Sequence, residues 1–285
     1  MRSLCIFSSY FESPHMPRYV RIYLNELKMH FNDVLFIANN ISSTDEVFLN
    51  GNNILFMRTE NEGYDFGMWY KALKSLDTVN YERIGLVNDS TILFGKLDSF
   101  FTWLDKENPD FAGLTDSYLL DYHIQSYFLI INIKAIPYML EYFTKNGIRS
   151  DIDEVIRTYE VGLSRYLINA GMNCQAMYNV PEKGEYNYAL LQAKSLIKKG
   201  FPLVKKKIIT RLYTSERWWS MVVIGFDPFP AHYIKLIERK YEVPDNMFKE
   251  LMDSKGGFAG LKFNLISFMA ILLGKISGKG KIVIE

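Results

Sequence analysis

The chain has 285 residues, of which 48% are hydrophobic and 23% charged, so it is long enough for one large α/β domain with or without an appendage. Its net charge of +1 conceals −7 on residues 1–180 and +8 on residues 181–285. Two cysteines, both in expected strands, argue against a disulfide framework, and the longest apolar run, near residues 265–273, is too short to span a bilayer. The first residues are typical of a strand, not of a leader peptide, so we expect a cytoplasmic protein.

Residues 1–180 alternate short apolar strands with helices. Strands are expected at residues 4–8, 34–38, 54–57, 83–87, 111–114, 125–132 and 174–178, and helices at 17–31, 66–76, 97–105, 135–146 and 152–170. Pro17 begins the first helix, and Gly171 ends the last. The polar segment between residues 38 and 54 is expected to be a connection. Such alternation predicts a largely parallel sheet with right-handed crossovers.

The composition changes after Pro181, where Lys-rich helices, two adjacent tryptophans and an apolar, basic tail follow. We therefore expect two domains, residues 1–181 and 182–285. The basic region suggests an anionic partner such as a membrane surface, although a solvated helical face would have the same composition. Nucleic acid is not expected as a partner, since there is no recognised motif and no basic face on the first domain.

Polar residues lie where several expected strands end, and open α/β sheets bind ligands at that edge. The donor-binding candidates follow the first and fourth strands or precede a helix whose backbone amides can meet phosphate. They are Ser8, Ser9, Tyr10, Asn61, Gly63, Tyr64, Asp65, Asn88, Asp89 and Ser90. A turn that satisfies its own backbone groups would explain the Asn-Asp-Ser run equally well.

Asp89 is the candidate ligand of a divalent cation, Mg²⁺ or Mn²⁺, because such a cation can neutralise the negative charge that grows on a diphosphate leaving group. His123 precedes a buried strand and could complete the coordination or donate to a phosphate or acceptor. More simply, it could close a loop by hydrogen bonding. With Gln125 it is assigned to the donor or acceptor pocket.

Glu160 lies within an expected helix and is the candidate general base for an acceptor hydroxyl; the alternative is an exposed helical glutamate. Gly162 destabilises that helix relative to alanine, which suggests that another group approaches closely there. Asp116 is the second candidate base, because it ends a strand at the same edge. The chain has no GxGxxG, Walker lysine or GxSxG motif.

Five ordered blocks resemble the rhamnan synthesis F family, bacterial glycosyltransferases of cell-wall, capsule and O-antigen assembly. The blocks are residues 61–67 (NEGYDFG), 86–90 (LVNDS), 113–117 (GLTDS), 123–128 (HIQSYF) and 159–164 (YEVGLS). The resemblance runs over roughly residues 3–240. It implies a GT-A-like (Rossmann-like) α/β fold: a mixed, mostly parallel sheet flanked by helices, with a helical C-terminal appendage.

The resemblance also implies roles. Residues 88–90 occupy the place of the Asp-x-Asp metal motif with a single carboxylate, Asn61-x-Gly63 resembles the Asn-x-Gly loop of large inverting families, and Glu160 falls where their catalytic base lies. The implied reaction is hexosyl or deoxyhexosyl transfer, with rhamnose suggested by the family name. The sugar would pass from a nucleoside diphosphate donor to a hydroxyl of a lipid-linked surface polysaccharide. The alternative is a non-catalytic GT-A-like scaffold protein.

The implied location is peripheral, on the inner face of the plasma membrane. Basic and aromatic residues of the second region would contact anionic lipid headgroups, namely Lys205, Lys206, Lys207, Arg211 and Trp218. The apolar stretch 263–276 would lie in the membrane interface.

Overall fold

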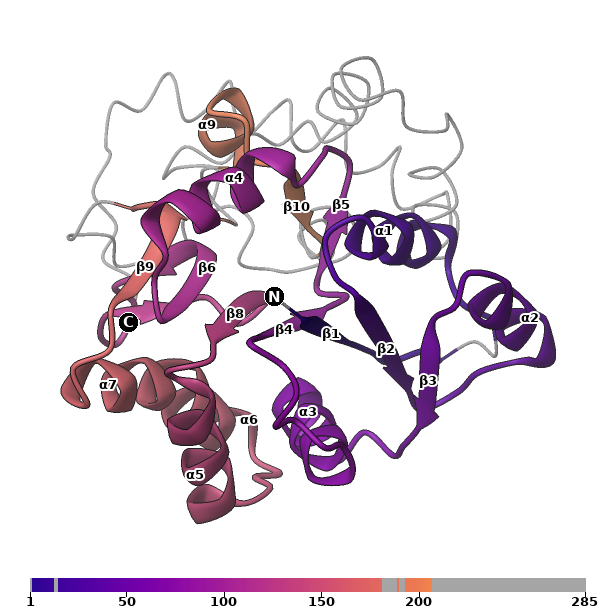
Figure 1. Cartoon of the computed structure of the whole chain (residues 1–285), viewed down its shortest axis with the longest axis horizontal. Coiled ribbons are helices and arrows are strands. Elements are labelled where there is room, and N and C mark those ends of the chain that lie inside the picture. Colours follow the sequence, from indigo (N-terminus) through magenta and orange to yellow (C-terminus); the bar gives the residue numbers. More distant parts are fainter. Residues whose placement is uncertain (1, 13–14, 181–188, 190–192, 207–285) are drawn as a thin grey trace, which may run out of the picture. The chain divides into compact units, whose positions relative to one another are not determined.

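The computed structural model describes residues 2–12, 15–180, 189 and 193–206 (Figure 1). The chain divides into two compact units. The first comprises Met1–Thr91 with Lys96–Tyr186, and the second Ile92–Gly95 with Asn187–Glu285. The four residues Ile92–Gly95 therefore belong to the second unit, although the residues on both sides of them in the sequence belong to the first.

The first unit is built on an eight-stranded sheet of order β3-β2-β1-β4-β8-β6-β7, with β9 paired to β6. The strands are β1 (Ser3–Ser9), β2 (Asp33–Ala38), β3 (Leu55–Arg58), β4 (Arg83–Asn88), β6 (Phe111–Ser117), β7 (His123–Ile124), β8 (Phe128–Asn132) and β9 (Cys174–Tyr178). The parallel pairs are β2 with β3, β2 with β1, β1 with β4, and β6 with β9. In contrast, β8 runs antiparallel to both β4 and β6. The mixed, mostly parallel sheet expected from the sequence is confirmed.

Helices cover both faces of this sheet (Figure 1). They are α1 (Arg18–Lys28), α2 (Ser43–Gly51), α3 (Tyr64–Ser75), α4 (Asp98–Glu107), α5 (Ile136–Asn146), α6 (Ile152–Val155), the π-helical turn η1 (Ile156–Val161) and α7 (Gly162–Asn169). Side chains alternate along β1, so Leu4 and Ile6 join the core under α3, α5 and α7. Phe7 packs edge-on against Tyr23 of α1, on the other face.

Three local expectations are wrong. The expected connection at residues 38–54 contains α2, which starts with a capping box: Ser42 Oγ accepts from Asp45 N–H, and the Asp45 carboxylate accepts from Ser42 N–H. The expected strand 125–132 is shorter in the structure, because residues 125–127 turn between β7, which ends at Ile124, and β8, which begins at Phe128. The expected helix 152–170 is interrupted by η1.

Both cysteines lie in strands and neither forms a disulfide, as expected. Cys5 is fully buried, and this burial raises the pKa of its thiol far above the ordinary value.

The described part of the second unit is small. It contains β5 (Thr91–Leu93) except for Thr91, which belongs to the first unit, together with its partner β10 (Leu203–Lys205), and α9 (Ala193–Lys198). Phe94 N–H also donates to Pro202 O, at 3.1 Å. The predicted lipid contacts at Lys207, Arg211, Trp218 and residues 263–276, like most of the predicted helical appendage, lie outside the described residues. Within the described part of the chain, none of the helices combines the length and hydropathy that crossing a bilayer requires.

Candidate functional site

The carboxyl end of the sheet is tied to the start of α3 by Asp65. Its Oδ1 accepts from Ser8 Oγ at 3.2 Å, and its Oδ2 accepts from Asn88 Nδ2 at 2.7 Å. Ser8 is the penultimate residue of β1 and Asn88 the last residue of β4, and the two residues are in register. Three predicted donor residues from distant parts of the sequence are therefore joined through one carboxylate.

The turn before α3 requires glycine at position 63. Gly63 has φ of +75°, and a Cβ there would lie 2.6 Å from Ile148 Cγ2 and 3.1 Å from Arg149 O. Tyr64 also has a positive φ, of 55°, and is 39% exposed. Asn61 is exposed as well. The predicted loop thus has its backbone held tightly while its side chains face solvent.

Asp89 lies directly after β4 and receives a hydrogen bond from a residue that the sequence analysis missed. Tyr19 Oη of α1 donates to Asp89 Oδ2 at 3.1 Å. Burial and the neighbouring Asp89 charge raise the pKa of Tyr19 far above its ordinary value, so the hydroxyl keeps its proton. Asp89 N–H donates to Ser8 O at 3.2 Å, and Ser90 N–H donates to Asn88 Oδ1 at 3.0 Å.

The segment after β1 presents Ser9 and Tyr10. Ser9 is fully buried, and its Oγ has no hydrogen-bond partner among the residues the structure describes. Tyr10 is 50% exposed. The next residue, Phe11, is held by Asn39, whose side chain accepts from Phe11 N–H at 2.8 Å and donates to Phe11 O at 2.9 Å. Asn39 was also missed, since its partner lies 28 residues away.

Asp116, the second candidate base, is the penultimate residue of β6 and is buried. Its Oδ1 accepts from Val180 N–H at 2.7 Å. Burial raises the pKa of this carboxyl, and the Val180 hydrogen bond and the His123 charge oppose that rise. Asp116 is therefore a structural acceptor as well as a candidate base.

His123 and Gln125 lie beside this strand and are both buried. His123 Nδ1 donates to Asp121 O at 2.9 Å. Gln125 Oε1 accepts from Thr115 Oγ1 at 3.3 Å. Thr115 Oγ1 is also hydrogen-bonded to the hydroxyl of Tyr127.

Glu160 lies in η1 and faces the turn between β7 and β8. Its Oε1 accepts from Ser126 Oγ at 2.7 Å and from Ser126 N–H at 3.4 Å. One turn later, Ser164 Oγ accepts from Ile124 N–H at 3.1 Å. Three hydrogen bonds therefore hold this helix beside the segment that carries His123 and Gln125.

The donor set at Asp89 fits a cation that is completed by its substrate. It supplies a single carboxylate, and Mg²⁺ is commonly bound by one or two carboxylates together with substrate phosphates and water. Among the described residues, the single group of three metal-compatible ligand atoms within 4.8 Å of one another is Glu26, His30 and Asp98. Neither Asp89 nor His123 belongs to it. Lys96 Nζ lies 2.9 Å from Glu26 Oε2, so an ammonium already balances that carboxylate.

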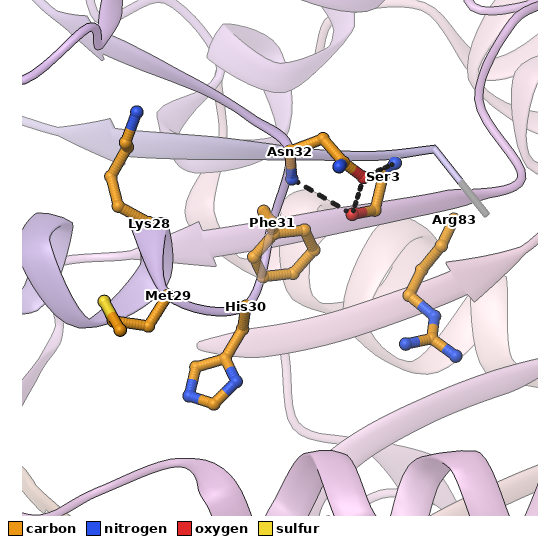
Figure 2. A pocket seen from close by; sticks show the side chains of 7 residues that line it. All are labelled: Ser3, Lys28, Met29, His30, Phe31, Asn32 and Arg83. Atoms are coloured by element: carbon orange, nitrogen blue, oxygen red, sulfur yellow. Dashed lines mark hydrogen bonds between the residues drawn. The ribbon is translucent and has the colours of Figure 1, made fainter.

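A cavity of about 350 Å³ lies at the opposite, amino end of the sheet and is shown in Figure 2. It is lined by Ser3, Lys28, Met29, His30, Phe31, Asn32 and Arg83. The Lys28 and His30 side chains point in opposite directions (Figure 2). The Arg83 guanidinium donates to Asn132 Oδ1 and pairs with Asp105 at 2.8 Å. The cationic groups thus do not converge on one point.

Comparisons with known proteins agree with the ordered blocks of the sequence. Two Vibrio anguillarum proteins, each named Virulence protein VirA, are 26% identical over 216 residues, which is 73% of this chain and 65% of theirs. The chain thus spans less than two thirds of the length of these relatives.

Two solved structures share a distant likeness. The 4-diphosphocytidyl-2C-methyl-D-erythritol synthase of Anaerococcus prevotii has a TM-score of 0.42 and 11% identity, over 69% of this chain and 98% of that one. The galactosyltransferase LgtC, bound to donor and acceptor sugar analogs, has a TM-score of 0.39 and 12% identity, over 66% and 74%. These scores are low, so the fold assignment rests on the strand order itself. The profile of the family described as Rhamnan synthesis protein F matches residues 34–224, and the chain belongs to this family.

Proposed function

We propose that the protein is a glycosyltransferase that moves a sugar from a nucleoside diphosphate donor to a hydroxyl of a surface polysaccharide. The observation that carries this proposal is the gathering of polar residues from all five family blocks at the carboxyl edge of one sheet. The hydrogen bonds from Ser8 and Asn88 to Asp65 are its clearest part. The family description supports rhamnose as the sugar.

The donor would lie over the ends of β1 and β4 and the start of α3. Ser8, Ser9 and Tyr10 would meet the nucleoside, where the buried Ser9 hydroxyl offers an unused donor and acceptor. The loop at Asn61, Gly63 and Tyr64 would meet phosphate or sugar through its backbone amides and side chains. Asp65 would hold these elements in register.

Asp89, positioned by Tyr19, would face the diphosphate and hold a divalent cation with His123 or with substrate oxygens. Such a cation neutralises charge on the leaving diphosphate. Glu160 would accept the proton of the acceptor hydroxyl, with Asp116 as the second candidate. His123 and Gln125 would line the pocket between donor and acceptor.

We further propose a lipid-linked acceptor at the inner face of the plasma membrane. The excess of basic residues after residue 180 supports this location, because anionic lipids attract such segments. Flotation with anionic liposomes, with and without residues 258–285, tests it. Equal recovery of both proteins would contradict the proposal.

The competing function is a non-catalytic scaffold protein of polysaccharide assembly. The observation that favours it is the single carboxylate of residues 88–90, whose Oδ2 is already hydrogen-bonded to Tyr19. Hydrolysis of a nucleotide-sugar without acceptor separates the two functions, since a scaffold protein releases no nucleotide.

The first experiment is a thermal-shift titration with UDP, dTDP, GDP and CDP, each with and without Mg²⁺ or Mn²⁺. A ligand that binds the folded state raises Tm by mass action. We expect one nucleotide to raise Tm and the rise to be lost in Asp89→Ala. No rise with any nucleotide, in a folded protein, would favour the scaffold.

A further inference from the structure

The helix that carries Glu160 departs from α-helical geometry at that residue. Gly162 N–H donates to Arg157 O, five residues back, and residues 156–161 form a π-helical turn. A regular α-helix would instead join Gly162 N–H to Thr158 O, four residues back. Single π turns within α-helices are rare and occur frequently at functional sites.

A tyrosine from another helix donates to the carbonyl that Gly162 N–H would otherwise contact. Tyr142 Oη of α5 donates to Thr158 O at 2.6 Å. Burial raises the pKa of Tyr142, with Arg149 and Arg165 opposing the rise, so the hydroxyl keeps the proton that it donates. Tyr142 therefore supplies the π turn with a hydrogen bond from outside the helix.

Gly162 gives that hydroxyl room to approach. A Cβ at position 162 would lie 2.5 Å from Tyr142 Oη and 2.9 Å from Arg157 O. Gly162 has an ordinary helical φ of −66°, so glycine is required for space and not for backbone conformation. The close approach that the sequence suggested at this glycine is confirmed, and the approaching group is the Tyr142 hydroxyl.

We propose that Tyr142 and Gly162 hold the π turn open and thereby set the position of the Glu160 carboxylate against Ser126. Ser164, just beyond the turn, is fixed by its hydrogen bond from Ile124 N–H. Closing the turn to α geometry would rotate Glu160 relative to Ser164 by up to about 100°, the angle of one α-helical residue. That rotation would break the 2.7 Å hydrogen bond from Ser126 Oγ. Tyr142 and Gly162 are thus positioning residues, and their effect on turnover rests on the proposed role of Glu160.

The first test needs no substrate. Tyr142→Phe removes only the hydroxyl, and Gly162→Ala adds only the methyl group that displaces it. We expect amide hydrogen exchange to become at least about tenfold faster in both peptides that report the contact, residues 156–164 and 123–128. Tyr138→Phe on the same helix and Gly51→Ala, where a Cβ meets nothing within 4 Å, are the matched controls and should exchange as wild type.

The second test measures hydrolysis of dTDP-rhamnose. We expect Tyr142→Phe and Gly162→Ala to lower kcat by about 10- to 100-fold, with KM for the donor within about twofold, because a displaced base slows the chemical step more than binding. A general loss of structure would raise KM and lower Tm instead.

Wild-type exchange in both peptides of both variants would overturn the proposal. Unchanged kcat, alongside inactive Glu160→Gln, would overturn it too, because the base would then work without the Tyr142 contact. If Glu160→Gln hydrolyses the donor like wild type, the catalytic role of Glu160 fails on its own. Faster exchange at residues 123–128 would still support the positioning contact in that case.

Discussion

The two ends of the central sheet hold carboxylates in different ways. At the amino end, Asp33 pairs with Arg2, Asp105 with Arg83, and Asp110 with Lys134. At the carboxyl end, Glu62 pairs with Lys71 and Asp121 with Arg165, but the hydrogen bonds described for the four candidate-site carboxylates come from neutral groups. Asp65 accepts from Ser8 and Asn88, Asp89 from Tyr19, Asp116 from Val180 N–H, and Glu160 from Ser126.

This difference matters because a carboxylate that accepts from neutral donors keeps its charge for a substrate proton or a cation. Ion pairs at the other end neutralise charge and fasten strands to helices. The comparison therefore predicts that substitutions at the carboxyl end change activity and binding, whereas those at the amino end change stability.

The largest effect is expected for Glu160→Gln. Removing a general base lowers the rate by about 10²- to 10⁴-fold, and the amide can still accept from Ser126, so the fold should be retained. Steady-state release of nucleotide from dTDP-rhamnose measures the loss. Glu154→Gln, an exposed position on the same helix, is the control. Equal losses in the two variants would show that helix charge, and not the base, matters.

Next in size is Asp65→Asn. It replaces the charged acceptor shared by Ser8 and Asn88, and hydrogen bonds to charged groups contribute about 1.5–3 kcal/mol. We expect the nucleotide that raises Tm to bind about 10- to 100-fold more weakly, measured by calorimetric titration. Asp33→Asn, at the amino end, should bind it as wild type does. Equal nucleotide affinity of the wild type, Asp65→Asn and Asp33→Asn would contradict the proposed difference between the two ends of the sheet.

Glu26→Gln should act on stability alone. Although burial raises the pKa of Glu26, hydrogen bonds from His30, Leu97 N–H and Lys96 lower it to about 2. Its stabilising contribution is therefore present above the unfolded pKa of about 4.3 and is lost as the pH falls towards 2. At pH 7 we expect the variant to lose about 1–3 kcal/mol of unfolding free energy in urea, with nucleotide binding unchanged. A loss that persists at pH 2.5 would contradict this account.

The smallest effect is expected for Asp116→Asn. Since burial raises the pKa of Asp116, the folded state favours its protonated form, and the stability that this contributes is lost as the pH rises. The difference in unfolding free energy should thus move in favour of the variant between pH 3 and 7. Parallel pH profiles would show that the Val180 hydrogen bond offsets the effect of burial on this pKa.

The strands and the ligand-binding edge of the sheet could be predicted from the sequence. The spacing of apolar residues in a strand, and the polar residues that follow it, are local features of the chain. Buried β1 and β4 each end in polar residues, so Ser8 and Asn88 could be assigned to one edge. In contrast, α2 has only two buried residues, Asp45 and Leu49, and therefore carries no apolar stripe to reveal it. Its capping box was the available signal.

The remaining contacts of the site are made by residues that are distant in the sequence, so they could not be predicted from it. Tyr19 lies 70 residues from Asp89, and nothing around either residue specifies the contact. The π turn depends on a hydroxyl from a different helix. Even so, the glycine at position 162 marked the place, because an unexpected glycine within a helix indicates crowding.

The pairing of β5 with β10 has a consequence for work with fragments. A protein shortened to residues 1–181 would keep Thr91–Leu93 but lose Leu203–Lys205, its partner strand. The edge of β5, whose Ile92 and Leu93 are buried in the whole chain, would then lack this partner, and an open strand edge promotes self-association. Insoluble material from such a truncation would reflect this lost strand and would say nothing about the catalytic competence of the sheet.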